Sequence, residues 1–360
     1  MIYHKNQLIY KFCLIIILIY ILFDKSENLK MILDAIKTIE LLKASKNVII
    51  LTHTNPDADA IGSSTALAYY LLNSCTKVQI LISGEYPSNL NFLNHDNLVS
   101  SFNPEYHNHL FQECDLICAL DFNDPTRIKE IMNLMIESKA NKLIIDHHIK
   151  PKEFTDFQFI DTNACSTGEL IWRIFRSDTN FNLDSKIATA LYAAIMTDTG
   201  SFRFPKTTSE VHRIVANLID AGADPVYVYD CVYNQFPLSA TKLKGIGYSK
   251  LEQYFDNKVC IMTLSKSDFQ TASAVEEETE GFVESLMAIK DVKVGILIIE
   301  SPDSNQIRCS FRAKGDFEVR TLAEKFNGGG HYQAAGARVF DMSLESVKQA
   351  IIYEAGLLFS

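Results

Sequence analysis

Four short apolar runs, separated by helical patterns, constrain the fold most strongly. They occupy residues 47–53, 77–83, 114–122 and 141–148. Each contains at least three consecutive apolar residues, whereas a strand with one face in water alternates apolar and polar residues. Strands of this kind, with helices between them, form parallel sheets covered on both faces. We therefore predict an α/β fold whose N-terminal domain is a parallel sheet with helices on both faces.

Acidic residues and histidines follow three of these runs and one helical pattern. They are His53, Asp57 and Asp59 after the first run, Asp121 at the end of the third, Asp146, His147 and His148 at the end of the fourth, and Asp198 at the end of the helical pattern over residues 184–198. Because the carboxyl ends of parallel strands meet at one edge of a sheet, we expect these residues to converge.

Five converging carboxylates would repel one another unless cations neutralised them. A pair of divalent ions is the simplest solution, and carboxylate and imidazole ligands without thiolate suit manganese or a similar metal. Two such ions activate water and stabilise an in-line displacement at phosphorus. The pattern therefore predicts a binuclear metal site for phosphoester chemistry.

The pattern changes after residue 225. Residues 226–257 predict a helical connector, and residues 258–360 predict a second, smaller α/β domain. Two of its strands follow one another without a helix, which indicates a mixed or antiparallel sheet. A glycine run before His331 could form an anion-binding nest, and Arg312, on a strand, could pair with a phosphate. The glycines of this run are Gly328, Gly329 and Gly330.

The charge balance limits the partners. With 34 basic and 44 acidic residues the net charge is −10, which does not favour long duplex nucleic acid, whose binding rests on many contacts from lysine and arginine to phosphate. A small anionic substrate remains compatible, because metal ions and arginines can reverse the field inside a cleft. The eight cysteines are scattered without a C-x-x-C pair, which favours a reducing cytoplasmic location.

The first thirty residues are unlike the rest. Residues 12–23 are continuously apolar, but twelve helical residues span about 18 Å, less than the roughly 30 Å of a bilayer core. Three interpretations stay open: an upstream extension before a true start at Met31, an inner-membrane anchor through residues 8–23, and a cleaved signal peptide. The last lacks an A-x-A-like site after the run. A membrane partner is expected only if residues 1–30 are a real anchor.

Five stretches resemble a known family. "HTNPDADAIGSS", "ALDFND", "LIIDHHI" and "MTDTGSFRF" are similar, in this order, to the four motifs of the DHH phosphoesterase superfamily. Residues 309–337, "CSFRAKGDFEVRTLAEKFNGGGHYQAAGA", resemble its DHHA1 domain. The resemblance covers nearly everything from residue 31 onward. It implies a DHH catalytic domain over residues 31–225, a DHHA1 domain over residues 258–360, and an active site in the cleft between them.

The resemblance also implies residue roles. His53, Asp57 and Asp121 would hold one metal ion. A second ion would be held by Asp59, Asp121, His147 and Asp198. His148 would face the substrate and Asp146 would orient a histidine, while Arg312, His331 and the glycines before it would hold the nucleotide. Arg203 either contacts substrate or pairs with a neighbouring acid. Two small departures are Ala58, where relatives often have glycine, and Asn327, before three glycines rather than four.

The short members of the family, called nanoRNases or bifunctional oligoribonuclease and pAp phosphatase proteins, are the most similar. The implied function is hydrolysis of short 5′-phosphorylated oligonucleotides such as pApA to mononucleotides, with dephosphorylation of 3′-phosphoadenosine 5′-phosphate (pAp) as a companion activity. The alternatives are a cyclic dinucleotide phosphodiesterase and a catalytically silent nucleotide-binding module. A homodimer remains open as the assembly.

Overall fold

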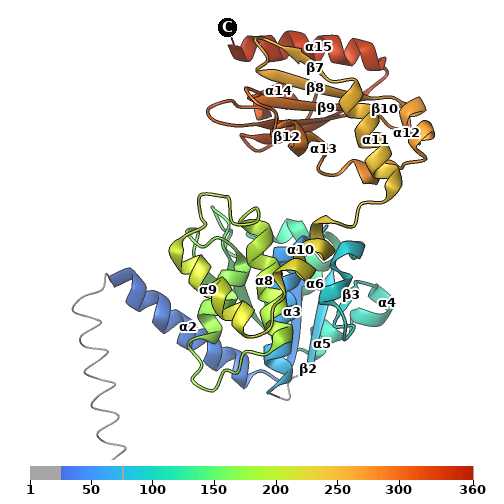
Figure 1. Ribbon diagram of the computed structural model, residues 1–360. Coiled ribbons are helices and arrows are strands. Elements are labelled where there is room, and N and C mark those ends of the chain that lie inside the picture. The colour runs from blue at the N-terminus through green and yellow to red at the C-terminus, as the bar shows by residue number, and fades with distance from the viewer. Residues whose placement is uncertain (1–25, 75–76, 360) are drawn as a thin grey trace, which may run out of the picture. The chain divides into compact units, whose positions relative to one another are not determined.

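The computed structural model describes residues 26–74 and 77–359 (Figure 1). The apolar run at residues 12–23, on which the predictions of an extension, anchor or signal rest, lies outside the described residues. No helix in the described ranges is both long enough and apolar enough to cross a membrane. The chain forms two compact units, unit 1 up to Gln235 and unit 2 from Phe236 onward.

Unit 1 is built on a six-stranded sheet in the order β3-β2-β1-β4-β5-β6, and every neighbouring pair is parallel. Its strands are β1 (Asn47–Thr52), β2 (Lys77–Ile82), β3 (Val99–Ser101), β4 (Leu116–Leu120), β5 (Asn141–Asp146) and β6 (Phe157–Ile160). The four apolar runs form the four central strands, as predicted. The short edge strands β3 and β6 were not predicted.

Helices cover both faces of this sheet, which explains why its central strands are apolar throughout. The first face packs with Val48 and Ile50 of β1 against residues of α2, α3, α7 and α8. The second packs with Ile49 and Leu51 against residues of α5, α6 and η2. The helices are α2 (Ser26–Ala44), α3 (Ala58–Leu72), α4 (Pro104–His107), α5 (Leu110–Glu113), α6 (Met132–Glu137), α7 (Thr167–Phe175), α8 (Ser185–Asp198), α9 (Ser209–Asp220) and α10 (Pro225–Tyr233), with 3-10 turns η1 (Ser88–Leu93) and η2 (Pro125–Ile131).

Helices α3 and α8 lie against each other because their contact is lined by small residues (Figure 1). A Cβ atom on Gly62 of α3 would lie 2.4 Å from the carbonyl oxygen of Ala190 and 3.2 Å from Ala194 Cβ. Only a glycine permits this approach, since real side chains do not reach such separations. The contact brings the start of α3 and the end of α8, both of which carry predicted site residues, into the same layer.

Unit 2 contains a mixed six-stranded sheet in the order β11-β12-β10-β9-β8-β7, in which only β8 and β9 are parallel. This confirms the prediction of a mixed sheet. Its strands are β7 (Glu252–Tyr254), β8 (Val259–Leu264), β9 (Val294–Glu300), β10 (Gln306–Ala313), β11 (Gly329–Gly330) and β12 (Ala334–Phe340). Its helices are α11 (Leu238–Ser249), α12 (Lys266–Ala272), α13 (Phe282–Leu286), α14 (Arg320–Glu324) and α15 (Leu344–Gly356), with 3-10 turns η3 (Glu276–Thr279) and η4 (Leu357–Phe359).

The connector between the units differs from the sequence prediction. Residues 226–257 are shared between the units: α10 belongs to unit 1, whereas α11 and β7 belong to unit 2. Helix α11 runs through Gly245 and Gly247 without interruption, and a Cβ atom on Gly247 would lie 2.6 Å from the sulfur of Met262. η3 and α13 are separate elements, because Gly281 adopts a φ of 75° between them.

Candidate metal centre

The expected metal ligands come from adjacent elements of unit 1. His53 follows β1, Asp121 follows β4, and His147 follows β5; these three strands are neighbours in the sheet. Asp57 caps the start of α3 by accepting a hydrogen bond from the backbone N–H of Ala60 at 3.0 Å. Asp59 lies in the first turn of α3, and Asp198 is the last residue of α8. All six are therefore at the carboxyl edge of the sheet or at a helix end beside it.

Three groups of possible ligand atoms result among the described residues; one joins Asp121, His147 and His148, and the other two contain all six expected ligands. In each of these two, one donor atom per residue lies within 4.8 Å of the others: His53 with Asp57 and Asp121, and Asp59 with His147 and Asp198. Asp121 faces both groups, since its Oδ2 is 3.5 Å from His53 Nε2 and its Oδ1 is 3.5 Å from His147 Nε2. Its φ of 63° turns the chain sharply as it leaves β4. Asp121 therefore lies between the two groups of ligand atoms.

His147 is surrounded by carboxylates. Its Nε2 lies 3.1 Å from Asp198 Oδ2 and 3.7 Å from Asp59 Oδ2, in addition to its contact with Asp121. Burial alone would lower the pKa of His147, but hydrogen bonds to Asp121 and Asp198 outweigh this and raise the pKa to about 11. In the metal-free protein the imidazolium of His147 is therefore the cation that balances this part of the cluster.

Negative charge in the cluster is only partly balanced. Asp59 is fully buried, and burial together with the charges of Asp121 and Asp198 raises its pKa well above the ordinary value. Burial acts in the same direction on Asp121, but hydrogen bonds from His147 and His53 lower its pKa overall. A raised carboxyl pKa marks a position where a cation would be stabilised. The donor set of carboxylates and imidazoles fits divalent ions such as manganese.

The histidine ligands differ in how they are held. His53 Nδ1 lies 3.0 Å from the carbonyl oxygen of Thr54, so this nitrogen donates and Nε2, which faces Asp121, is the nitrogen that could bind a metal ion after losing its proton. His147 Nδ1 is buried and has no hydrogen-bond partner among the described residues. Asp57, in contrast to Asp59, is exposed. The cluster is thus buried around Asp59 and reaches solvent at Asp57.

Two residues of α7 that the sequence prediction missed support the acids. The backbone N–H groups of Thr167 and Gly168 donate to the two oxygens of Asp59 at 2.7 and 2.9 Å. The hydroxyl of Thr167 donates to Asp121 Oδ1 at 2.9 Å. A signal was present, because Ser166 and Glu169 have the S-x-x-E spacing that begins helices, and a helix N-terminus favours anions.

His148 and Asp146 form a separate pair beside the cluster. His148 Nδ1 lies 2.7 Å from Asp146 Oδ1 and 3.8 Å from Asp121 Oδ1. The His148 side chain is 36% exposed, whereas that of Asp146 is fully buried. Asp146 therefore holds His148 rather than His147, and it fixes a ring that solvent or substrate can reach.

Arg203 does not pair with an acid among the described residues. It is exposed just beyond the end of α8, and its Nε donates to the carbonyl oxygen of Gly200 at 2.7 Å. This contact orients the guanidinium without neutralising its charge.

The expected substrate residues of unit 2 have defined surroundings of their own. Arg312 on β10 donates through Nε to Glu284 Oε1 at 2.8 Å, and its Nη1 donates to the Phe311 carbonyl. His331 is exposed and follows β11. A Cβ atom on Gly328 or Gly330 would lie 2.2 or 2.5 Å from a carbonyl oxygen of β12, so strand packing explains these two glycines. At Gly329 a Cβ atom would meet nothing within 4 Å.

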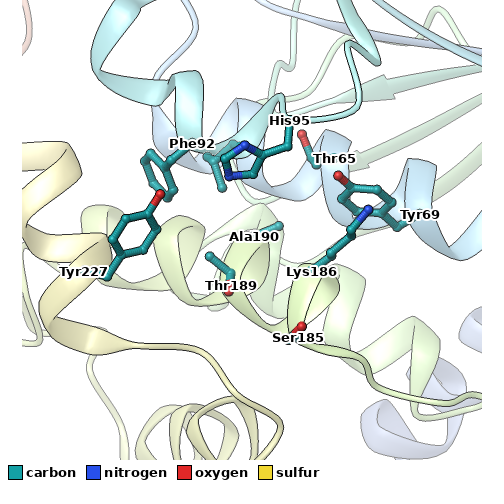
Figure 2. Close-up of a pocket in the computed structure, with 10 residues that line it drawn as sticks. Thr65, Tyr69, Phe92, His95, Ser185, Lys186, Thr189, Ala190 and Tyr227 are labelled. Atoms are coloured by element: carbon teal, nitrogen blue, oxygen red, sulfur yellow. The ribbon is translucent and has the colours of Figure 1, made fainter.

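Unit 1 also contains a cavity of about 140 Å³ (Figure 2). Tyr69, Phe92, His95, Lys186 and Tyr227 contribute to its wall. The ring of Tyr227 meets that of Phe92 edge-on, with 5.9 Å between the ring centroids. The cavity opens beside the first half of α8, whereas Asp198 ends that helix.

Comparison with known proteins agrees with the motifs. Residues 47–195 match the DHH family, N-terminal domain, and residues 256–355 match the DHHA1 domain. The chain is 28% identical over 309 residues to the bifunctional oligoribonuclease and PAP phosphatase NrnA of Bacillus subtilis, covering 85% of this chain and 93% of that protein. It is 27% identical to the protein of the same name from Thermus thermophilus, covering 87% and 90%.

A solved structure supports the fold of the whole chain. The crystal structure of an exopolyphosphatase-related protein from Bacteroides fragilis superposes with a TM-score of 0.81 at 29% identity, over 91% of this chain and 98% of that one. The match therefore covers both units of this chain. Together with the matched domains, this shows that the chain belongs to the DHH family, with an N-terminal DHH domain and a C-terminal DHHA1 domain.

Proposed function

We propose that this protein is a metal-dependent phosphodiesterase that hydrolyses short 5′-phosphorylated oligonucleotides such as pApA to mononucleotides. One observation carries the proposal: six possible metal ligands cluster at the sheet edge of a chain similar to bifunctional oligoribonucleases and PAP phosphatases. A complete ligand set argues against a catalytically silent nucleotide-binding module. Dephosphorylation of pAp is proposed as the companion activity.

Two divalent ions, manganese in the first place, are the proposed cofactors. His53, Asp57 and Asp121 would hold one ion, and Asp59, Asp121, His147 and Asp198 the other. Bound there, such ions would activate water for attack and neutralise charge on the phosphate. The fit is supported by the uncompensated charge at Asp59 and by the two faces that Asp121 presents.

The chain's own residues would then position the metal ligands and protonate the leaving oxygen. Thr167 and Gly168 fix both oxygens of Asp59, so this ligand cannot rotate when an ion binds. Asp146 holds His148 by its Nδ1, which leaves Nε2 directed away from Asp146. From there Nε2 can donate a hydrogen bond or a proton to the leaving oxygen of the phosphodiester.

Unit 2 supplies the proposed contacts to the nucleotide. Arg312 and His331, with the backbone of Gly329, would bind the terminal phosphate or sugar, and Arg203 of unit 1 would contact the substrate near the reacting phosphate. Arg312 already holds Glu284, so a substrate phosphate would share this guanidinium or displace the carboxylate. A bidentate arginine contact suits a phosphate group.

A cytoplasmic location and exclusion of long duplex nucleic acid complete the proposal. All six cysteines in the described ranges are free thiols, and four of them are buried, as expected in a reducing compartment. The net charge of −10 disfavours a long polyanion that is bound through many phosphate contacts. The anchor interpretation would add a membrane to the partners without changing the reaction.

The test compares substrates side by side. The purified protein is treated with EDTA, reloaded with Mn²⁺ and offered pApA, pAp, cyclic di-AMP and pyrophosphate in separate assays. We expect hydrolysis of pApA first and of pAp second, with no activity in EDTA. Asp121→Asn should lose both activities, whereas Asp220→Asn, an exposed acid at the end of α9, should retain them.

Four outcomes would overturn the proposal. Preference for cyclic di-AMP would identify a cyclic dinucleotide phosphodiesterase, and preference for pyrophosphate would remove nucleotides from the substrate class. Binding of pApA without hydrolysis at any metal concentration would indicate the silent module. Equal degradation of pApA and of a long single strand would contradict the restriction to short substrates.

A further inference from the structure

We propose that a groove on one face of the unit 2 sheet binds the nucleotides of an oligonucleotide that extend beyond Arg312, with Arg308 and Arg338 contacting phosphates and Phe340 stacking on a base. The groove has a volume of about 720 Å³, within the range of ligand sites. The choice of an oligonucleotide as its occupant rests on the proposed function.

Strand register creates the groove. β10 and β12 are antiparallel neighbours in which Arg308 lies opposite Arg338 and Ser310 opposite Gly336. Because side chains alternate along a strand, these four share one face. Cys309, between two of them, points into the core on the other face. One face of the sheet therefore carries both arginines above a floor of small residues.

The bottom of the groove lacks a side chain at Gly329, although folding does not require a glycine there. A side chain at Gly329 would meet open space, and this residue does not adopt a positive φ. Neither packing nor backbone strain explains the glycine, in contrast to Gly328 and Gly330. Bare backbone allows a ligand to approach closely. Gly336, directly opposite Gly329 in the sheet, continues this floor.

The charges favour an anion. Like charges directly opposite each other on neighbouring strands are destabilising, and Arg308 and Arg338 occupy such a pair of positions. Arg308 is held by Thr279 and lies 3.5 Å from Glu276. Arg338 is exposed and contacts only the neutral side chain of Gln306 among the described residues, at 3.2 Å. Its guanidinium is therefore available to a phosphate.

An aromatic ring follows on the same face. Phe340 lies two residues beyond Arg338 on β12, opposite Gln306, and is 59% exposed. Proteins that bind single-stranded nucleic acid combine a cationic groove with exposed aromatic rings on which bases stack. An exposed phenylalanine beside two arginines matches this combination better than it matches a metabolite with one phosphate.

Distance along the strand sets the length of the occupant. Arg312 and Arg308 are four residues apart on β10, which corresponds to about 14 Å. A mononucleotide held at Arg312 does not reach Arg338 from there, whereas an oligonucleotide of a few units does. The groove therefore adds affinity for substrates longer than a mononucleotide.

The experiment compares ligands of different length. Fluorescence anisotropy in EDTA, which prevents hydrolysis, measures the Kd of the full chain for labelled 5′-phosphorylated tetra-adenylate and, by competition, for AMP. For Arg338→Gln we expect the ratio of the tetra-adenylate Kd to the AMP Kd to rise about tenfold, the loss of one charge-assisted hydrogen bond. The slope of log K against log salt should fall by about 0.7. Phe340→Ala should raise the ratio without changing that slope.

Arg320→Gln is the matched control, because Arg320 is an exposed arginine of the same unit that lies on α14 outside the groove. The proposal is overturned if Arg338→Gln behaves like this control, or if both Kd values rise equally. Thermal melts confirm that each variant is folded. If the wild type hydrolyses pApA but Arg338→Gln leaves the ratio of the two Kd values unchanged, the groove is rejected and the proposed function stands. Binding that depends on Arg338, without hydrolysis by the wild type in Mn²⁺, would reject the proposed function alone.

Discussion

Asp146→Asn separates the positioning of His148 from metal binding. Asp146 is fully buried, and its Oδ1 accepts the 2.7 Å hydrogen bond from His148 Nδ1. Its Oδ2 is buried without a partner among the described residues. Asparagine has nearly the same size, so the packing stays intact while the negative charge is lost. The substitution therefore weakens the contact that fixes the ring and leaves the six expected ligands unchanged.

The magnitude follows from this hydrogen bond. A bond to a charged group contributes about 1.5–3 kcal/mol and a neutral one about 0.5–1.5 kcal/mol, so the loss is about 1.4 kcal/mol. That loss corresponds to about a tenfold decrease in kcat. KM should change little, because Asp146 acts through His148 and does not contact the substrate. Manganese stoichiometry should equal that of the wild type.

A double-mutant cycle tests the reasoning. Steady-state kinetics with pApA are measured for Asp146→Asn, His148→Asn and the double variant. If Asp146 works only by holding His148, the double variant should be no slower than His148→Asn, since the two residues act as one unit. A further tenfold loss in the His148→Asn background would refute the account and point to an effect of Asp146 elsewhere in the cluster.

Three further predictions concern metal dependence and stability. The pKa of His147 rises from 6.5 in the unfolded chain to about 11 in the folded protein. Its contribution to stability is therefore complete below pH 6.5 and is lost as the pH rises toward 11. Thermal melts in EDTA should show a lower Tm at pH 9 than at pH 6. Mn²⁺ should raise the Tm more at pH 8 than at pH 6, because ions bind the neutral imidazole; an equal rise would contradict this. Gly62→Ala should destabilise by about 1–3 kcal/mol in urea unfolding because its Cβ meets Ala190, whereas Gly245→Ala, in open space on α11, should stabilise by up to about 1 kcal/mol.

Much of unit 1 could be predicted because apolar strand runs alternate with helical patterns along the sequence. Continuous apolar runs such as residues 48–51 indicate strands buried on both faces, and both faces of the sheet are covered. The acids and histidines that end these runs could be expected at one edge, since that edge is common to all parallel strands. The short strands β3 and β6 gave no such signal, because three or four residues are too few for a period.

The support around the metal ligands was harder to predict. No local pattern shows that the N–H groups of Thr167 and Gly168 meet Asp59, 108 and 109 residues earlier in the chain. That contact depends on how α7 packs beside α3. The glycines before His331 were interpreted as a phosphate nest, but two of them are explained by strand packing. The sequence of a glycine run does not show whether neighbouring backbone or a ligand occupies the place of the missing side chains.

The most direct test of the metal centre is an anomalous difference map from crystals of the protein grown with Mn²⁺. The account predicts two peaks in unit 1. One lies beside His53, Asp57 and Asp121, and the other beside Asp59, His147 and Asp198. A map with no peak at these side chains, or with manganese bound only elsewhere on the chain, would contradict it.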